Sequence, residues 1–253
     1  MKKLASSFKN SKLYAFLKRA HIFYLFLAIM LYMVKLLMYN ISSSINPNGH
    51  IWNMTIDNKI PFIKYFVIFY YTYYFLPIVL LWLVSFKDKK KFYICLSSIF
   101  VCCFISNLIY SIYNVKSVRP DYINPNMTLK DITSFDMIFD FMVAKIYKID
   151  PTGLNCFPSI HASLGVFMVI LSISKDKERR ISKIISLIGI ISGVLCAIST
   201  VFIKQHYLVD TIAGVGLAII CYILITLLYN KKRGCKKINF IDWSLGATAP
   251  FFI

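Results

Sequence analysis

Acidic residues are scarce in this chain of 253 residues, which holds 11 Asp and Glu against 29 Lys and Arg. Charged residues of either sign make up 16% of the chain, well below the roughly one quarter that is usual for a soluble domain. Glycine and proline are also few, with nine and eight residues, which excludes collagen-like and low-complexity disordered chains. The scarcity of charge excludes a soluble globular domain.

The cysteines do not form a recognisable framework. The seven cysteines are odd in number, contain no Cys-x-x-Cys pair and lie mostly inside apolar runs. A disulfide-stapled module and a zinc site of the Cys-x-x-Cys type are therefore excluded. We expect the cysteines to pack as small apolar residues.

Long apolar runs make up much of the chain, and 58% of its residues are hydrophobic. Six runs reach about the 20 residues that a helix needs to cross a bilayer. They cover residues 21–40, 62–85, 92–113, 158–174, 184–203 and 207–229. Backbone groups in hydrocarbon must form their hydrogen bonds within one segment, so these runs predict an all-α integral membrane protein built as a six-helix bundle. Pro77 inside the second run predicts a kink there.

Basic residues gather in short segments between the apolar runs. Residues 1–20, 86–91, 175–183 and 230–253 hold 20 of the 29 Lys and Arg. Because cytoplasmic loops are enriched in these residues, both termini are predicted to lie in the cytoplasm. The basic residues do not form one solvated face, so we expect no nucleic-acid partner. Lys35 lies inside the first run near its outer end, where we expect it to snorkel to the interface and keep a functional role as the alternative.

Three parts are predicted along the chain: a basic amphipathic leader (1–20), a six-span membrane domain (21–229) and a basic cytoplasmic tail (230–253). The leader suits a helix lying on the inner leaflet, and a solvated leader without fixed structure is an equal alternative. In the long outer connection, residues 128–148 carry apolar side chains at helical spacing. This spacing predicts a short interfacial helix along the outer surface.

Polar residues collect at the outer ends of the apolar runs. One cluster, residues 150–163, opens the fourth run, and a second, residues 199–210, crosses the turn between the fifth and sixth runs. Together with a third outer connection, they supply Arg119, Ser159, His161, Lys204, His206 and Asp210. Because the predicted topology places all three connections on one side, we expect these residues near one membrane–water interface.

Two histidines among cations suit phosphoryl transfer. Cations can hold a phosphate while one imidazole attacks phosphorus and the other protonates the leaving oxygen. His206 and Asp210 are four residues apart, so on a helix the carboxylate can reach a ring nitrogen and fix its tautomer. The same residues leave a metal site of two histidines and one carboxylate open as an alternative, which the neighbouring cations disfavour. We therefore expect no metal and no cofactor.

Both clusters resemble motifs of the type 2 phosphatidic acid phosphatase superfamily. Residues 157–162 read FPSIHA and residues 204–210 read KQHYLVD, which is similar to the second and third motifs of that superfamily. An Arg-Pro pair at 119–120 resembles the end of its first motif. The branch that looks most similar is the one related to the inositol phosphorylceramide and sphingomyelin synthases. The resemblance agrees with a six-span membrane fold.

The resemblance also implies roles for individual residues. His206 would be the nucleophile that becomes phosphohistidine, with Asp210 as its partner and His161 as the general acid to the leaving group. Ser159 would help to hold the phosphate. From their place at the outer edge, Arg119 and Lys204 are our further candidate phosphate ligands, with a headgroup anchor as the alternative for Arg119. Asn155 and Asp150 either support the site or cap the loop, and Lys116 is a third candidate supporting position.

Three positions depart from the motifs. The Lys of the first motif is Ile112 here, the Arg of the third motif is Thr200, and the Gly of the second is Ile160. The phosphate site thus lacks two cations, and Lys204, together with Lys116, is our candidate for replacing them. A lysine is a point charge and cannot reproduce the bidentate fork of an arginine, so substrate preference is expected to differ from that of the phosphatase branch.

The function predicted in this way is that of a lipid phosphatase or phosphotransferase that needs no metal. It would lie in the plasma membrane with its active site on the extracytoplasmic side, and its partners would be a lipid phosphate or phospholipid substrate and the surrounding lipids. Hydrolysis by water and transfer to a lipid or polyol hydroxyl, as in sphingolipid synthases, share their first step and are both open. A non-catalytic transporter or binding protein is a second alternative. It would need charged residues near the midplane of several spans, where this sequence has almost none.

Overall fold

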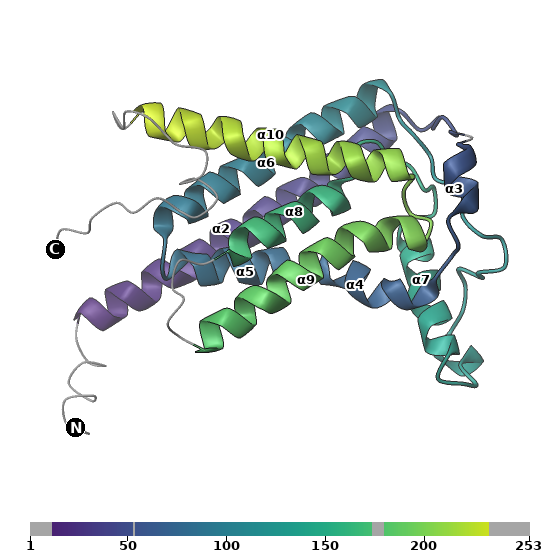
Figure 1. The fold of residues 1–253 in the computed structure, drawn as a ribbon, viewed down its shortest axis with the longest axis horizontal. Coiled ribbons are helices and arrows are strands. Elements are labelled where there is room, and N and C mark those ends of the chain that lie inside the picture. The colour runs from purple at the N-terminus through teal and green to yellow at the C-terminus, as the bar shows by residue number, and fades with distance from the viewer. Residues whose placement is uncertain (1–11, 53, 174–179, 233–253) are drawn as a thin grey trace.

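The computed structural model describes residues 12–52, 54–173 and 180–232. Regular structure within these residues is helical, apart from one isolated β-bridge between His50 and Val115. The long helices run roughly along the long axis of the molecule (Figure 1). The prediction of an all-α membrane protein is confirmed at this level, because several of the helices are long and apolar enough to cross a bilayer.

The chain order of the helices is simple. They are α2 (Lys12–Ile45), α3 (Thr55–Lys59), α4 (Val67–Thr72), α5 (Leu76–Ser85), α6 (Lys89–Ile112), α7 (Met137–Ile149), α8 (Ile160–Ser172), α9 (Arg180–Phe202) and α10 (Leu208–Lys232), with 3-10 turns η1 (Lys64–Phe66) and η2 (Leu129–Asp131). Five candidate spans lie within the described residues: Ile22–Ile45, Lys64–Ser85, Lys89–Ile112, Lys183–Phe202 and Leu208–Lys231.

Helix α8 represents the predicted fourth span and is shorter than the others. Its 13 residues rise about 20 Å, which is less than the roughly 30 Å of a hydrocarbon core. It packs against α5, α6, α9 and α10, and lies between α9 and α10 in Figure 1. Most of its side chains are buried, including Leu164, Phe167 and Met168. This helix therefore forms the centre of the bundle and contacts protein on most sides.

The second predicted span is broken, as the proline in it suggested. Residues 73–75 separate α4 from α5, and Pro77 lies in the first turn of α5. A proline there lacks the N–H that would continue the ladder of hydrogen bonds from the preceding helix. The predicted interruption at Pro77 is confirmed, and two tyrosines next to the break, Tyr70 and Tyr73, are buried.

Helix α7 lies in the long outer connection, where a short helix was predicted. It begins at Met137 instead of residue 128, because η2 and a capping box between Thr128 and Asp131 occupy the start of the predicted stretch. Its buried side chains Val143 and Ile146 pack in a cluster with residues of α4 and of the turn after α9. The helix thus connects the long loop to the helical bundle.

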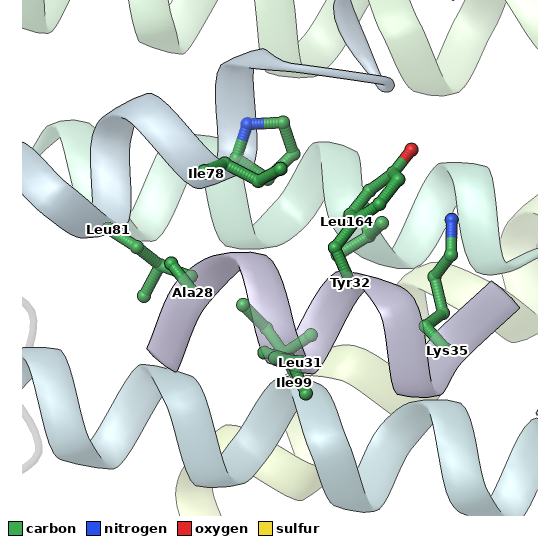
Figure 2. A pocket seen from close by; sticks show the side chains of 9 residues that line it. Ala28, Leu31, Tyr32, Lys35, Ile78, Leu81, Ile99 and Leu164 are labelled. Atoms are coloured by element: carbon green, nitrogen blue, oxygen red, sulfur yellow. The ribbon is translucent and has the colours of Figure 1, made fainter. Parts of the chain in front are cut away.

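Lys35 does not snorkel, so that prediction is wrong. Its side chain on α2 is 3% exposed, and its Nζ donates a hydrogen bond to Tyr73 Oη. The ammonium also lies 3.9 Å from the ring centroid of Tyr32 and 4.1 Å from that of Tyr73. Figure 2 shows Lys35 and Tyr32 projecting from α2 into the same small pocket. Two aromatic faces stabilise this cation inside the bundle, in a place where water cannot.

The two ends of the molecule differ in what they carry. The beginning of α2 and the end of α10 lie at one end, and α3 and α7 lie at the other (Figure 1). Residues 1–11 of the predicted leader and 233–253 of the predicted tail are outside the described residues. Six of the seven cysteines are described and all six are buried and free, as expected, whereas Cys235 is outside the described part.

Candidate active site

Two histidines, one at the start of α8 and one in the turn between α9 and α10, meet at the end of the bundle that carries α3 and α7. His161 lies in the first turn of α8, and His206 lies just before α10. His161 Nδ1 is 2.9 Å from His206 Nε2, a hydrogen-bond distance. The structure therefore brings together the two histidines of the two polar clusters.

The other ring nitrogen of His206 is held by the backbone. His206 Nδ1 is 3.0 Å from the carbonyl oxygen of Cys156, an atom that can only accept. Nδ1 must therefore carry the proton, which leaves Nε2 with its lone pair and makes His161 Nδ1 the donor between the two rings. This tautomer is assigned from the partners, and it places the nucleophilic nitrogen of His206 on the side of His161.

A tyrosine completes the row on the far side of His161. Tyr70 Oη of α4 is 2.6 Å from His161 Nε2, and the two rings stack with centroids 4.7 Å apart. The ring of Tyr73 lies on His161 as well, with centroids 4.1 Å apart. A phenol can donate to a neutral imidazole and accept from a charged one, so Tyr70 can hold His161 in either protonation state. Sequence reasoning did not find Tyr70, and the only signal was the run of tyrosines around it.

Asp210 lies close to His206 but makes a different hydrogen bond from the predicted one. Its Oδ2 is 3.7 Å from His206 Nδ1 and accepts a bond of 2.8 Å from the amide of Tyr207. Helix α10 starts only at Leu208, so His206 and Asp210 do not share a helical face, and Asp210 instead reaches back to cap the helix. The carboxylate is fully buried and can still stabilise positive charge on His206 through space.

The turn after α9 sets the position of His206. Lys204 has a φ of 55°, in the left-handed region, and the amides of Gln205 and His206 both donate to the carbonyl oxygen of Thr200. This is how many helices end, with one left-handed residue and amides folded back onto the last carbonyls. The chain reverses here within a few residues, and His206 stays beside the end of α9.

Lys204 lies at the site with two of its three ammonium donors in use. Its Nζ donates to the carbonyl oxygens of Asp57 and Ile60 at 2.9 and 2.6 Å. Partial burial lowers the pKa of this ammonium below its usual value. One N–H remains for another acceptor, because the described residues provide only these two.

Arg119 forms an ion pair instead of standing free. Its guanidinium contacts Asp150 Oδ2 at 2.7 Å and Gln205 Oε1 at 3.1 Å, and lies 4.6 Å from the ring centroid of Tyr147. Asp150 thus holds the guanidinium of Arg119 in place. Arg119 Nε and Gln205 Nε2 are both buried without a hydrogen-bond partner among the described residues. These donors are available to an anion, and Gln205 is a second residue that sequence reasoning did not find.

Ser159 caps α8 and joins it to α10. Its Oγ accepts from the amide of Ala162 at 3.2 Å, and its own amide donates to the carbonyl oxygen of Asp210 at 3.0 Å. The Cβ that Gly214 lacks would overlap the Ser159 carbonyl, so only glycine allows the two helices to approach this closely. The serine hydroxyl keeps its proton for donation, and its position is fixed by both helices.

The last two candidate supporting residues, Asn155 and Lys116, form no hydrogen bond with His161 or His206 within the described residues. Asn155 is buried and bonds to Asn114, to the carbonyl oxygen of Tyr39 and to Ser43 Oγ, so it joins the loop before α8 to α2 and to the end of α6. Lys116 is exposed, and only its backbone atoms have hydrogen bonds among the described residues. The hydrogen bonds of Asn155 and Lys116 therefore do not orient their side chains toward His161 and His206.

A cavity of about 290 Å³ lies beside His206. Arg119 and Lys204 supply cations to its lining, Asp57 supplies a carboxylate, and Tyr207 supplies an aromatic wall. Such a mixture of fixed donors with one acceptor is typical of a site for a small polar group. A phosphate in this cavity would be next to the ring that carries the free Nε2.

A metal ion fits these side chains poorly. Cys156 Sγ, His206 and Asp210 offer ligand atoms within 4.8 Å of one another. Burial, together with the charge of Asp210, raises the pKa of the Cys156 thiol well above its usual value. Because the thiolate is the form that binds metal, this cysteine is a weak ligand, and His206 Nδ1 is already bound to a carbonyl. The side chains favour chemistry carried out by the two imidazoles.

A comparison with models of protein families shows which family the chain belongs to. A family model described as the PAP2 superfamily matches residues 45–224, which is most of the chain. The chain belongs to the PAP2 superfamily. The comparison with curated proteins and the comparison with solved structures give no match. Membership of the PAP2 superfamily indicates phosphatase- or phosphotransferase-type chemistry, and the matched region contains His161 and His206.

Two of the residues that depart from the PAP2 motifs lie away from the cavity beside His206. Ile112, where the first motif has Lys, is 81% exposed at the end of α6. Thr200, where the third motif has Arg, is buried, and its Oγ1 is 3.0 Å from Thr211 Oγ1, so it joins α9 to α10. Neither side chain lines the cavity beside His206. The cations that do line it are Arg119 and Lys204.

Proposed function

We propose that this PAP2 superfamily protein is a membrane lipid phosphatase or phosphotransferase that cleaves a lipid phosphoester through a phosphohistidine. The observation that carries the proposal is the row of atoms Cys156 O, His206, His161 and Tyr70 Oη, in which each polar atom is at hydrogen-bond distance from the next. With Nδ1 tied to a carbonyl, His206 has one nucleophilic nitrogen, Nε2.

The first chemical step follows from that row. His206 Nε2 attacks phosphorus, the nitrogen–phosphorus bond forms, and the bond from phosphorus to the lipid oxygen breaks. His161 acts in its doubly protonated form, with Nε2–H donated to Tyr70 Oη. It gives its Nδ1 proton to the leaving oxygen and becomes neutral. Tyr70 bonds to the other nitrogen of His161 throughout, and Asp210 stabilises the charge on His206 from 3.7 Å.

Phosphate binding is assigned to three residues in this proposal. Arg119 offers its buried Nε, Lys204 offers its third ammonium donor, and Ser159 offers its hydroxyl at the start of α8. Asp150 holds Arg119 in place, and Gln205 adds an amide donor beside it. The missing motif cations are thus compensated in part by neutral donors, which favours a phosphodiester or a singly charged phosphate over a dianion.

We also propose the membrane orientation and span count. The bundle would have six spans, with α8 as the central and shortest one, and both termini in the cytoplasm. Support comes from the basic residues Lys87, Lys89, Lys90 and Lys91, which lie in the connection from α5 to α6 and in the first turn of α6. That connection is at the end of the bundle away from α3 and α7 (Figure 1). The positive-inside rule favours a cytoplasmic place for that end, so the histidines would lie at the outer leaflet, in the plasma membrane by our proposal.

Transfer to an alcohol is the second form of the same function. Water or a lipid or polyol hydroxyl can resolve the phosphohistidine, and the similarity of the motifs to the sphingolipid synthase branch favours transfer. A cavity of about 290 Å³ is larger than a phosphate needs, which leaves room for an acceptor beside it. A non-catalytic binding role gains no support from the site, because its histidines bond to each other.

The test is a turnover assay on the purified protein. Labelled lipid phosphates and phospholipids are supplied in EDTA, with and without alcohol acceptors. We expect labelled phosphate, or a new labelled lipid when an acceptor is present. His206→Ala should lower turnover by about a thousandfold or more, as removal of a nucleophile does. His50→Ala is the matched control, because His50 is exposed and stacks on Tyr113 away from the pair. Turnover retained by His206→Ala would sink the proposal.

A further inference from the structure

Asp57 is a buried carboxylate that the proposed chemistry has not used. It belongs to the short helix α3, and its side chain is 8% exposed. Its Oδ1 accepts a hydrogen bond of 2.8 Å from the amide of Leu208, the first residue of α10. Its backbone carbonyl accepts from Lys204 Nζ at 2.9 Å. Asp57 is therefore fixed against both sides of the turn that carries His206.

The second oxygen of this carboxylate has no partner. Asp57 Oδ2 is buried and no donor among the described residues bonds to it. A buried acceptor without a donor destabilises the fold, and more so when it is charged. Asp57 and His206 line the same cavity. A donor that enters this cavity would satisfy the oxygen, which the described part of the chain leaves without one.

The chemistry of that donor follows from the other residues of the cavity. Arg119 and Lys204 suit the phosphoryl group, and a carboxylate repels it. Asp57 is suited instead to a neutral group that carries a proton. The neutral reactant that the proposed function requires is the hydroxyl that attacks the phosphohistidine. Resting on that function, we propose that Asp57 Oδ2 binds and deprotonates the attacking hydroxyl, from water or from an alcohol.

The hydroxyl oxygen forms a bond to phosphorus, the bond from phosphorus to His206 Nε2 breaks, and its electron pair returns to the ring. The hydroxyl proton goes to Asp57 Oδ2. His161 lost one proton to the leaving oxygen in the first step, so transfer of a proton from Asp57 to solvent and from solvent to His161 restores the enzyme. Asp57 thus acts only in the second half of the reaction.

A rapid-quench experiment separates the two halves. The full-length protein in detergent is mixed with a short-chain phospholipid and, separately, with a short-chain lipid phosphate, each carrying ³²P. Labelled protein is measured over time, first in water alone and then with added glycerol. Asp57→Asn keeps an oxygen that can accept from Leu208. We expect this variant to become labelled at the wild-type rate and to lose its label about 100-fold more slowly, in water and in glycerol, as removal of a general base does.

The matched control changes a carboxylate that lies outside the cavity lining. Asp136→Asn removes a carboxylate that bonds to Lys64 at the same end of the molecule, away from the cavity lining, and should leave both rates unchanged. An equal loss of labelling and of label release in Asp57→Asn indicates a purely structural contact and overturns the assignment, as does unchanged release. A wild-type protein that never becomes labelled overturns the proposed function itself, and the role of Asp57 with it.

Discussion

At the scale of single residues, the hydrogen bond from Tyr70 to His161 makes a prediction that motif reasoning does not. Tyr70→Phe keeps the ring that stacks on His161 and removes only the hydroxyl at 2.6 Å from Nε2. A buried hydrogen bond contributes about 0.5–1.5 kcal/mol, so kcat should fall about 3- to 10-fold. KM should stay near the wild-type value, because Tyr70 does not line the cavity.

The neighbouring tyrosine is the control for that measurement. Tyr74 lies in the same break between α4 and α5, and its hydroxyl has no hydrogen bond within the described residues. Steady-state kinetics of Tyr74→Phe should match those of the wild type. A Tyr70→Phe protein with unchanged kcat would show that His161 is oriented by ring packing alone.

The same residue scale shows what the sequence could and could not predict about the site. His161 and His206 were predictable because their short motifs carry the chemistry and lie at matched ends of apolar runs. Tyr70 was not, since its contact with His161 depends on how α4 packs against α8, two helices far apart in the sequence. Asp57 lies in a connection with no motif, and its position depends on one backbone amide of α10. Contacts of this kind depend on tertiary packing, which no local pattern records.

At the scale of helices, the docking of α8 on α10 holds the two histidines in register. Ser163 Oγ donates to the carbonyl oxygen of Gly214 at 2.8 Å, and the amide of Ser159 donates to that of Asp210. Gly214→Ala places a methyl group against the Ser159 carbonyl, where nothing flexible can move aside. Such overpacking typically costs about 1–3 kcal/mol, and here it also separates α8, which carries His161, from α10, which follows His206 directly.

We therefore expect Gly214→Ala to lower the midpoint of thermal unfolding and to reduce turnover at least tenfold. Gly216 on the same helix is the matched control, because a Cβ added there meets no atom within 4 Å. Gly216→Ala should unfold at or slightly above the wild-type temperature, as alanine is the better helix former. Equal behaviour of the two variants in a detergent-solubilised thermal melt would contradict the close approach of α8 and α10.

Helix prediction succeeded where apolar runs were long and failed where tertiary contacts intervene. The runs of α2, α6, α9 and α10 were predictable from length alone. Helix α8 is shorter than the other spans and packs against α5, α6, α9 and α10. A count of apolar residues does not show how much of a helix contacts protein. Lys35 was misjudged for the same reason: its position along α2 was known, but its aromatic partner Tyr73 comes from a different segment.

At the scale of the whole molecule, the orientation in the membrane connects the charge of the chain to its proposed site. The 29 basic residues lie mostly in segments that the positive-inside rule assigns to the cytoplasm, and the histidines lie at the opposite end. A single cysteine placed at either end can report the orientation. The six described native cysteines are buried, so only Cys235 needs to be replaced by serine as a background.

In that background, Lys130→Cys and Lys90→Cys put exposed thiols at the two ends of the bundle. We expect a membrane-impermeant maleimide to label Lys130→Cys on intact cells and to label Lys90→Cys only after permeabilisation. The reverse pattern would place the histidine pair in the cytoplasm, where its substrate would have to come from the inner leaflet. Because the chemistry of His161 and His206 is independent of side, turnover by the purified protein would survive that result, and only the source of the lipid would change.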